Sequence, residues 1–285
     1  MDFAKKIAVK IVKEESRPES NDTAIGFLSK NNPANLPFGT ILILRERLRH
    51  HVVLPNETEN QLLSIEQEYA ARERLGKYNL TPQKKILVYG PSGCGKALCA
   101  ERIAWDLGLP LLKVRFNSFS PFDFKKAVLN LEAIFDYCKK KPVVLLLDEC
   151  DFGGKSCVSW RGMDNKREIA NVLYGLLDEY DAPGLVIAAT NFGVEAFDDI
   201  LRSRFDDVIF ISKPQEAERK RLLETTLSAM RVSSDVDIEE ISDKLNCCSA
   251  AYVISVALRA AKISVLEGGD KICKEHFTQA LEEIS

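Results

Sequence analysis

KKILVYGPSGCGKA, residues 84–97, joins a short apolar stretch to a helical pattern through a turn rich in glycine. The apolar residues 86–89 predict a buried strand, and apolar residues at helical spacing follow Lys96. Glycines in such a turn let consecutive backbone N–H groups point inward, and the N-terminus of the next helix adds partial positive charge. The stretch therefore predicts a strand, a loop and a helix arranged as a phosphate-binding cradle.

The loop matches the phosphate-binding pattern G-x-x-x-x-G-K-[ST] at every fixed position except the last. Its candidate nucleotide-binding residues are Gly90, Pro91, Ser92, Gly93, Cys94, Gly95, Lys96 and Ala97. In this pattern the lysine reaches the β- and γ-phosphates, and a final hydroxyl binds Mg²⁺. Because alanine has no hydroxyl, we expect phosphate contacts to persist while nucleotide binding depends less on Mg²⁺. A glycine turn that only reverses the chain is the alternative, and the signals below argue against it.

Length and composition are typical of a soluble globular chain that is large enough for two domains. The chain has 285 residues, of which 46% are hydrophobic and 28% charged, and its net charge is −3. That charge argues against nucleic acid as the main partner. No apolar run reaches the roughly eighteen residues of a membrane span, and the N-terminal segment is too charged for a signal peptide. We therefore expect a cytoplasmic protein without a membrane partner.

The eight cysteines are scattered and form no C-x-x-C pair. This spacing is typical of free thiols in a reducing compartment, and two of them, Cys94 and Cys150, lie in or beside the phosphate-binding signals. With only three histidines in the chain, a structural zinc site is not expected.

Strand and helix patterns alternate through the middle of the chain. Apolar runs predict strands over 86–89, 111–116, 143–147, 185–189 and 208–211, and amphipathic patterns predict helices over 56–75, 122–140 and 168–180. This alternation is typical of an α/β domain with a parallel sheet. After residue 214 only helical patterns follow, over 215–230, 236–246, 249–266 and 274–284. We place an N-terminal segment and linker at 1–50, an α/β nucleotide-binding domain at 51–213 and a helical domain at 214–285.

The N-terminal part has weaker signals. Residues 2–14 carry apolar positions at helical spacing, which predicts a docked helix, with a partner-binding or membrane-surface helix as the alternatives. Residues 16–40 are typical of a linker, and residues 41–44 fit either a strand or the start of a helix. Asn56 is the expected N-cap of the first long helix.

Polar residues directly follow two of the predicted buried strands. Asp148 and Glu149 come after 143–147, and Asn191 comes after 185–189. Because parallel strands end at one edge of a sheet, we expect these side chains beside the phosphate loop. Asp148 would bind Mg²⁺ directly or through water, Glu149 would polarise the attacking water, and Asn191 would hold that water or sense the γ-phosphate. A pair of exposed acids at a loop start is the alternative for the two carboxylates.

Two arginines, Arg202 and Arg204, precede the last predicted strand in the segment LRSRFDD. An arginine given to a neighbouring subunit's site would stabilise transition-state charge, an effect of ~10³–10⁵ in rate in other nucleotide hydrolases. Surface arginines held in salt bridges are the alternative.

Together these motifs resemble those of the AAA+ ATPases over about residues 50–285. GPSGCGKA is similar to the Walker A motif, VVLLLDE to Walker B, AATN to sensor 1, and LRSRFDD to the arginine-finger segment, in which Arg204 is the better match. The helices after residue 249 resemble the family's lid. Within the family the chain is most similar to small bacterial proteins of the FtsH/Cdc48-like clade. The resemblance implies a P-loop NTPase fold with a five-stranded parallel sheet and a small all-helical lid.

The resemblance also implies a function. It implies an ATP hydrolase that uses ATP and Mg²⁺, assembles with itself into a ring, typically a hexamer, and remodels or unfolds a protein substrate, in some cases beside a protease. Ala97 departs from the family pattern and is expected to weaken turnover. Two alternatives remain open: a nucleotide-gated scaffold with little turnover, and a DNA-directed loader.

A second departure concerns the segment that grips substrate in the family's ring pore. The family has an aromatic-hydrophobic-glycine tip there, whereas this chain has the aromatics Phe122 and Phe124 without the glycine. Trp160, with Arg161, is the candidate in a second pore loop. Phe124 in the core of the next helix and Trp160 as an anchor of its loop are the alternatives.

Overall fold

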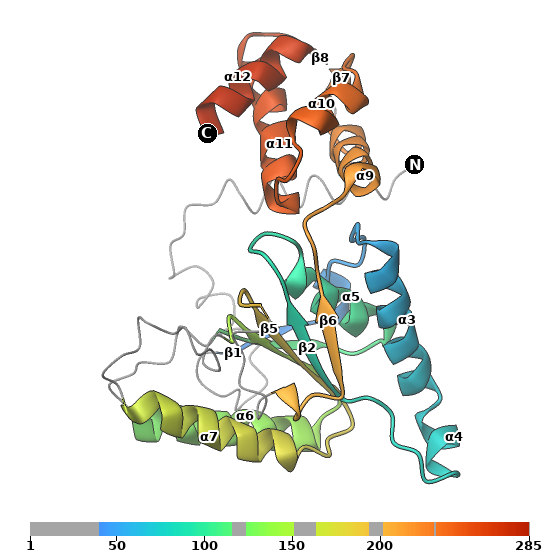
Figure 1. The fold of residues 1–285 in the computed structure, drawn as a ribbon, viewed down its shortest axis with the longest axis vertical. Coiled ribbons are helices and arrows are strands. Elements are labelled where there is room, and N and C mark those ends of the chain that lie inside the picture. The colour runs from blue at the N-terminus through green and yellow to red at the C-terminus, as the bar shows by residue number, and fades with distance from the viewer. Residues whose placement is uncertain (1–39, 116–123, 151–163, 194–201, 231, 285) are drawn as a thin grey trace. The chain divides into compact units, whose positions relative to one another are not determined.

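The computed structural model describes residues 40–115, 124–150, 164–193, 202–230 and 232–284 (Figure 1). The described residues form two compact units, which divide between Ser212 and Lys213. The helix expected over 2–14 and the pore candidates Phe122 and Trp160 lie outside the described residues. None of the helices within these ranges combines the length and hydropathy needed to cross a membrane.

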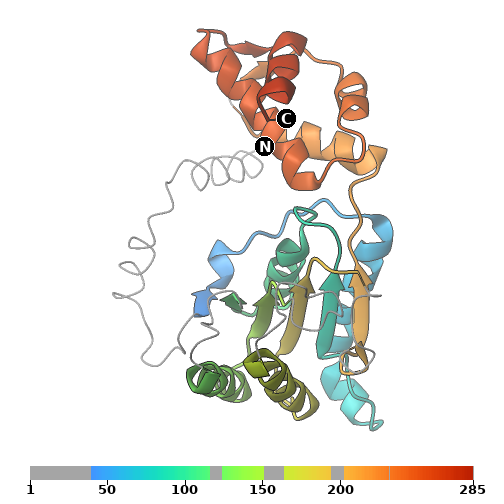
Figure 2. The ribbon, with the colours of Figure 1, turned by 60° about the vertical axis from the view of Figure 1, so that its left-hand side comes forward.

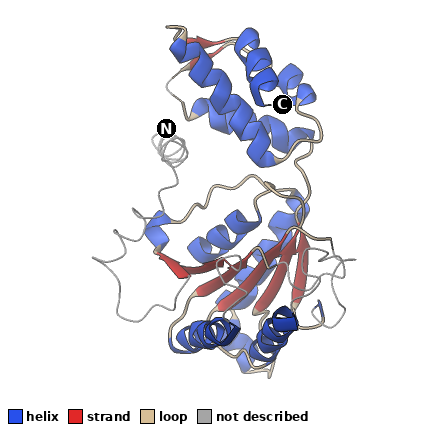
Figure 3. Ribbon diagram, turned by 90° about the vertical axis from the view of Figure 1, so that its left-hand side faces the viewer, coloured by secondary structure: helices blue, strands red, loops and turns tan. Residues whose placement is uncertain are grey.

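A six-stranded sheet forms the centre of the first unit, in the order β1-β3-β4-β5-β2-β6 (Figure 3). Its strands are β1 (Thr40–Ile43), β2 (Lys85–Tyr89), β3 (Leu111–Arg115), β4 (Val144–Asp148), β5 (Leu185–Thr190) and β6 (Asp207–Phe210). The last five pair in parallel, which confirms the α/β prediction. The expected count of five strands is one short, because β1 adds an antiparallel edge strand beside β3.

Helices cover both faces of this sheet (Figure 2). One face packs against α3 (Asn56–Ala70) and α5 (Lys96–Asp106), and the other against α6 (Phe124–Lys140) and α7 (Asp164–Asp178). Side chains alternate along β2: Ile86 and Val88 join the α3/α5 core, while Leu87 joins the α6/α7 core. Burial on both faces explains why the central strands are unbroken apolar runs in the sequence.

The first unit includes residues that the sequence assigned to the N-terminal segment. β1 lies in the sheet, and Arg49 forms a two-pronged ion pair with Glu101 on α5, with Arg49 Nη2 2.6 Å from Glu101 Oε1 and Nε 3.0 Å from Oε2. The Glu101 residue is only 4% exposed, so its charge needs this partner. The expected domain start at residue 51 is therefore too late.

The helix expected over 56–75 is divided in two at Ala71, into α3 and α4 (Arg72–Gly76). Asn56 is the first residue of α3 and Pro55 is its N-cap, without a side-chain hydrogen bond to the helix. The predicted capping role of Asn56 is therefore wrong.

The second unit is a small group of helices. They are α9 (Glu216–Ser228), α10 (Ile238–Lys244), α11 (Ala250–Leu266) and α12 (Lys274–Ile284). Arg219 is buried and donates hydrogen bonds to the carbonyls of Ser242 and Pro214, which ties α9 to its neighbours. The expectation of helices alone is wrong in one detail, since β7 (Ser233–Ser234) pairs in parallel with β8 (Lys271–Ile272).

A pair of neighbouring carboxyl groups, Glu66 on α3 and Asp106 on α5, makes the stability of the first unit depend on pH. Burial, and then the nearby Asp106, raises the pKa of Glu66 to about 7 from 4.5, against a smaller opposing effect of Arg102. A carboxyl whose pKa is raised by folding stabilises the fold fully below its unfolded pKa, and this contribution is lost as the pH rises through 7.

We therefore expect Glu66→Gln to raise the free energy of unfolding at pH 8 by roughly 1–2 kcal/mol, after allowance for solvent screening. At pH 4 the variant and the wild type should be nearly equal, because Glu66 is then neutral in both states. Urea unfolding at the two pH values measures the difference. Glu73→Gln, at an exposed position of α4, is the control, and an equal effect of Glu66→Gln at both pH values contradicts the account.

Candidate functional site

The glycine loop between β2 and α5 has a backbone that other residues would strain. Gly90, Gly93 and Gly95 have φ values of 148°, 73° and 98°. A Cβ atom on Gly90 would lie 2.1 Å from the carbonyl oxygen of Ile211, so the neighbouring backbone leaves no room for a side chain. The loop can therefore make its tight turn into α5 only with glycines at these positions.

Lys96 is the first residue of α5, and its side chain folds back over the loop. Its Nζ donates hydrogen bonds to the carbonyls of Gly90 and Pro91, both at 2.9 Å, and the residue is only 9% exposed. A buried ammonium at a helix N-terminus adds its full charge to the partial charge of the helix dipole. This end of the loop therefore attracts an anionic group such as phosphate.

The loop forms one wall of a cavity of about 210 Å³. The loop and α5 contribute Ser92, Gly93, Gly95, Lys96, Ala97 and Leu98, and the ends of β4 and β5 contribute Asp148, Glu149, Ala189, Thr190 and Asn191. The fold thus brings most of the predicted site residues to one cavity. Five predicted residues do not line it, namely Gly90, Pro91, Cys94, Arg202 and Arg204. Leu98 and Ala189 are lining residues that the sequence motifs did not single out.

The opposite wall is held by the parallel pairing of β4 and β5. The backbone N–H of Cys150 donates to the carbonyl of Ala189 at 2.8 Å, which keeps the ends of these strands together. Glu149, which lies between the last residue of β4 and Cys150 in the sequence, has a φ of 56°, an uncommon conformation for a residue with a side chain. Such local strain is characteristic of functional positions that the surrounding fold holds in place.

A cationic side chain that the motifs did not reveal stands beside this wall. Lys113 on β3 forms an ion pair with Asp148, with Nζ 2.6 Å from Oδ2. The sequence carried one signal for it, since Lys113 interrupts the apolar residues of LLKVR in a predicted strand. A lone lysine in a strand that is largely buried needs an acidic partner, but the partner's identity depends on the strand order.

The side chains around the cavity do not fit a protein-bound Mg²⁺ ion. Mg²⁺ requires oxygen ligands in a nearly octahedral arrangement. Ala97 offers none, Asp148 Oδ2 pairs with Lys113, and Asp148 Oδ1 accepts a hydrogen bond from the backbone N–H of Glu149 at 3.1 Å. In the described ranges of the chain, moreover, no three His, Cys, Asp or Glu side chains gather as a metal site.

The two candidate arginines differ in their environment: Arg204 is held in contacts with α7, whereas Arg202 is exposed to solvent. Arg204 Nη2 lies 3.2 Å from Asp178 Oδ2 on α7, and its guanidinium lies 4.9 Å from the ring centre of Tyr174. Arg202 is exposed. Neither residue lines the cavity of its own chain.

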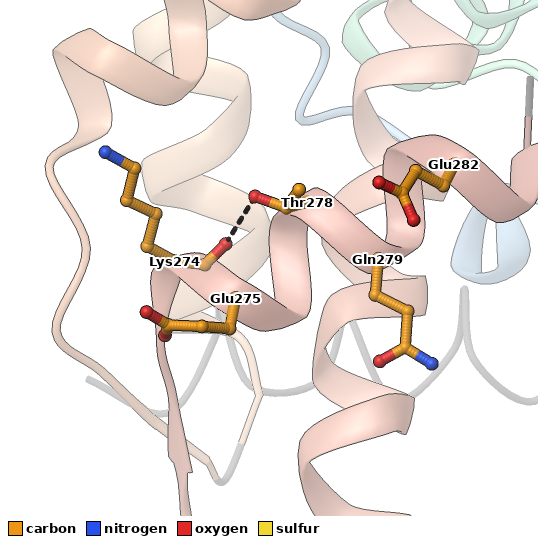
Figure 4. Close-up of a pocket in the computed structure, with 5 residues that line it drawn as sticks. All are labelled: Lys274, Glu275, Thr278, Gln279 and Glu282. Atoms are coloured by element: carbon orange, nitrogen blue, oxygen red, sulfur yellow. Dashed lines mark hydrogen bonds between the residues drawn. The ribbon is translucent and has the colours of Figure 1, made fainter.

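A larger hollow, of about 560 Å³, lies on the surface of α12 in the second unit (Figure 4). It is lined by Lys274, Glu275, Thr278, Gln279 and Glu282. All five come from one helix, and the Thr278 hydroxyl is turned to the helix's own Lys274 carbonyl at 3.2 Å. The smaller cavity is the better candidate site, because charged and polar groups from several elements converge there.

Comparisons with known proteins agree with this choice. The model of the ATPase family associated with various cellular activities (AAA) matches residues 86–213, from β2 to the end of the first unit. The "Uncharacterized AAA family ATPase y4kL" of Sinorhizobium fredii is 29% identical over 238 residues, which cover 84% of this chain and 71% of that protein.

Two longer relatives also match most of the chain. The "ATPase family gene 2 protein" of Schizosaccharomyces pombe is 30% identical over 231 residues, 76% of this chain and 27% of the relative. The "ATP-dependent zinc metalloprotease FtsH" of Helicobacter felis is 25% identical over 234 residues, 79% of this chain and 37% of the relative. The chain thus spans well under two thirds of these two relatives.

Proposed function

We propose that this chain, which is similar to ATPases of the AAA family, binds and hydrolyses ATP in the cavity between the glycine loop and the ends of β4 and β5. One observation carries this proposal. Lys96, Asp148, Glu149 and Asn191 come from three separate elements of the fold and line a single cavity beside a helix N-terminus. The cavity therefore joins a group that binds phosphate to groups that can act on a water molecule.

The proposed roles follow from the chemistry of each group. Lys96 and the backbone N–H groups of residues 92–97 bind the β- and γ-phosphates, because they concentrate positive charge at the start of α5. Glu149 accepts a proton from the attacking water, and Asn191 orients that water or the γ-phosphate through its amide. Asp148, which the sequence assigned to Mg²⁺, instead contributes a carboxylate that is neutralised by Lys113.

We further propose that copies of the chain assemble into a ring in which Arg204, with Arg202 as the second candidate, reaches the nucleotide of the neighbouring subunit. Arg204 is suited to this role because it lies outside its own cavity and its side chain is 20% exposed. The work of the ring would be to remodel or unfold a protein substrate. A protease is a candidate partner, since one relative is named an ATP-dependent zinc metalloprotease.

A specific observation favours a second candidate, a nucleotide-gated scaffold that binds ATP and assembles with little turnover. Ala97 and the Lys113–Asp148 ion pair both remove oxygen ligands that hydrolysis with Mg²⁺ would use. Measured turnover separates the two candidates, because the scaffold needs only binding.

Mixing two variants tests the assembly on which the proposal depends. Arg204→Ala should leave ATP affinity within about twofold but lower turnover by ~10³-fold or more, because only transition-state charge loses its partner. Glu149→Gln should also lose turnover, because it lacks the carboxylate that accepts the proton of the attacking water. Mixed rings contain some interfaces with both an intact Glu149 and an intact Arg204, so we expect the mixture to regain turnover.

Arg74→Ala, at an exposed position of α4, is the matched control and should leave turnover unchanged. Arg202→Ala, taken through the same assay, tests the second candidate, and size-exclusion chromatography with light scattering records the ring. A mixture that is no more active than its components, although both variants assemble, would show that Arg204 does not act across an interface.

A further inference from the structure

We infer that the ammonium of Lys113 takes the place beside Asp148 that a divalent cation would need, so that the chain binds nucleoside triphosphate without requiring Mg²⁺. The inference rests on the proposed function, since it concerns a nucleotide in the same cavity. The inference goes beyond the proposed function because it identifies Lys113 as the cation that neutralises Asp148 in place of Mg²⁺.

The sheet places this lysine firmly. In the parallel pairing of β3 with β4, Lys113 is opposite Leu146, two residues before Asp148. Side chains two apart on a strand share a face, so Lys113 and Asp148 lie on the same side of the sheet as Leu111 and Leu146, which pack in the α3/α5 core. That is the side on which the glycine loop leads into α5.

The ion pair is well shielded from water. Its atoms are 2.6 Å apart, and the side chains of Lys113 and Asp148 are 16% and 19% exposed. Separating two charges of this kind costs far more than it does at the surface, because each would be left without a partner in a site with little water. A Mg²⁺ ion that takes Asp148 Oδ2 as a ligand would have to displace Lys113, and one bound to Oδ1 would lie beside the ammonium, whose positive charge opposes it.

The cavity also lacks further oxygen ligands for Mg²⁺ that would offset the cost of displacing Lys113. Asp148 Oδ1 already accepts the N–H of Glu149 at 3.1 Å, and Ala97 stands where the loop pattern has a hydroxyl. An unpaired Asp148 would repel the triphosphate, whereas the paired one presents almost no net charge to it. With Lys96 at the phosphates and Lys113 at Asp148, the cavity holds an anion without help from a metal.

Equilibrium binding of ATP to the wild-type chain, in Mg²⁺ and in excess EDTA, is the first test. We expect dissociation constants that agree within about threefold, since the cavity's own charges do not change between the two buffers. Binding in Mg²⁺ but not in EDTA overturns the inference and leaves the proposed function standing. Absence of binding in both buffers overturns the proposed function, and the inference with it.

Two lysine variants form the second test. Lys113→Met keeps a long unbranched side chain but removes the charge, so we expect ATP affinity in EDTA to fall about tenfold or more and to recover when Mg²⁺ neutralises Asp148. Lys84→Met is the matched control, since it removes a lysine from an ion pair of equal length, 2.6 Å to Asp181 Oδ1. This pair precedes β2 and β5, so it lies at the amino ends of the strands, away from the cavity at their carboxyl ends. The ATP affinity of Lys84→Met should not change in either buffer.

Ala97→Thr combined with Lys113→Met restores the loop hydroxyl and frees the Asp148 carboxylate to bind a metal ion. ATP binding by this double variant should show the steepest dependence on Mg²⁺. If Lys113→Met binds ATP in EDTA as tightly as the wild type does, Lys113 is not the charge partner and the inference is wrong. If that variant fails to fold, the wild-type comparison still decides, because it uses no variant.

Discussion

Lys96→Ala is expected to abolish binding of ATP and ADP, with a loss in affinity of about a hundredfold or more, because hydrogen bonds from a charged donor are the strongest that a phosphate receives. The Lys96 residue is 9% exposed, and its ammonium is held over the loop by hydrogen bonds to the carbonyls of Gly90 and Pro91, so a flexible surface lysine does not replace it. Calorimetric titration with each nucleotide measures the loss.

Two controls show that the lost binding reflects the missing charge. Lys84→Ala, at the opposite edge of the same sheet, should bind nucleotide as the wild type does. A cooperative thermal transition of Lys96→Ala without nucleotide should show that the variant is folded, with a midpoint somewhat below the wild-type value because two hydrogen bonds to the loop carbonyls are lost. Unchanged affinity in a folded Lys96→Ala variant would mean that nucleotide binds elsewhere.

Glu149→Gln should lower ATP turnover by about 10²–10⁴-fold, the usual contribution of a general base, while leaving ATP affinity almost unchanged. Glutamine has the same shape as glutamate but cannot accept the proton of the attacking water. Single-turnover hydrolysis of bound ATP, measured beside equilibrium binding, separates the two effects.

Glu132→Gln, on an exposed position of α6, controls for the loss of one negative charge from the same unit. Turnover that is equal in Glu149→Gln and in the wild type would contradict the assignment of Glu149. If the wild type itself shows no turnover but binds ATP, the scaffold becomes the better account of the chain.

The sequence was most informative where one local pattern sets the structure. The glycine loop, the buried strands and the helices of the second unit all follow from residues that are close together in the chain. Asp148 and Asn191 were expected at one sheet edge because parallel strands end together, and both line the cavity.

The features that the sequence missed depend on contacts between distant residues. β1 joins the sheet through pairing with β3, some seventy residues later, and nothing in the pattern of residues 41–44 specifies that partner. The ion pair of Lys113 with Asp148 likewise requires the strand order to be known. Arg204 could be matched to a motif, but its contacts with Asp178 and Tyr174 come from the packing of α7.

Equilibrium dialysis of the wild-type chain against radiolabelled ATP tests the central claim most directly, because it measures occupancy of the cavity without assuming turnover, assembly or metal. The account predicts saturable binding that approaches one nucleotide per chain and that disappears in Lys96→Ala. A wild-type chain that retains no ATP at about 1 mM, the upper end of ordinary working substrate concentrations, would contradict the account.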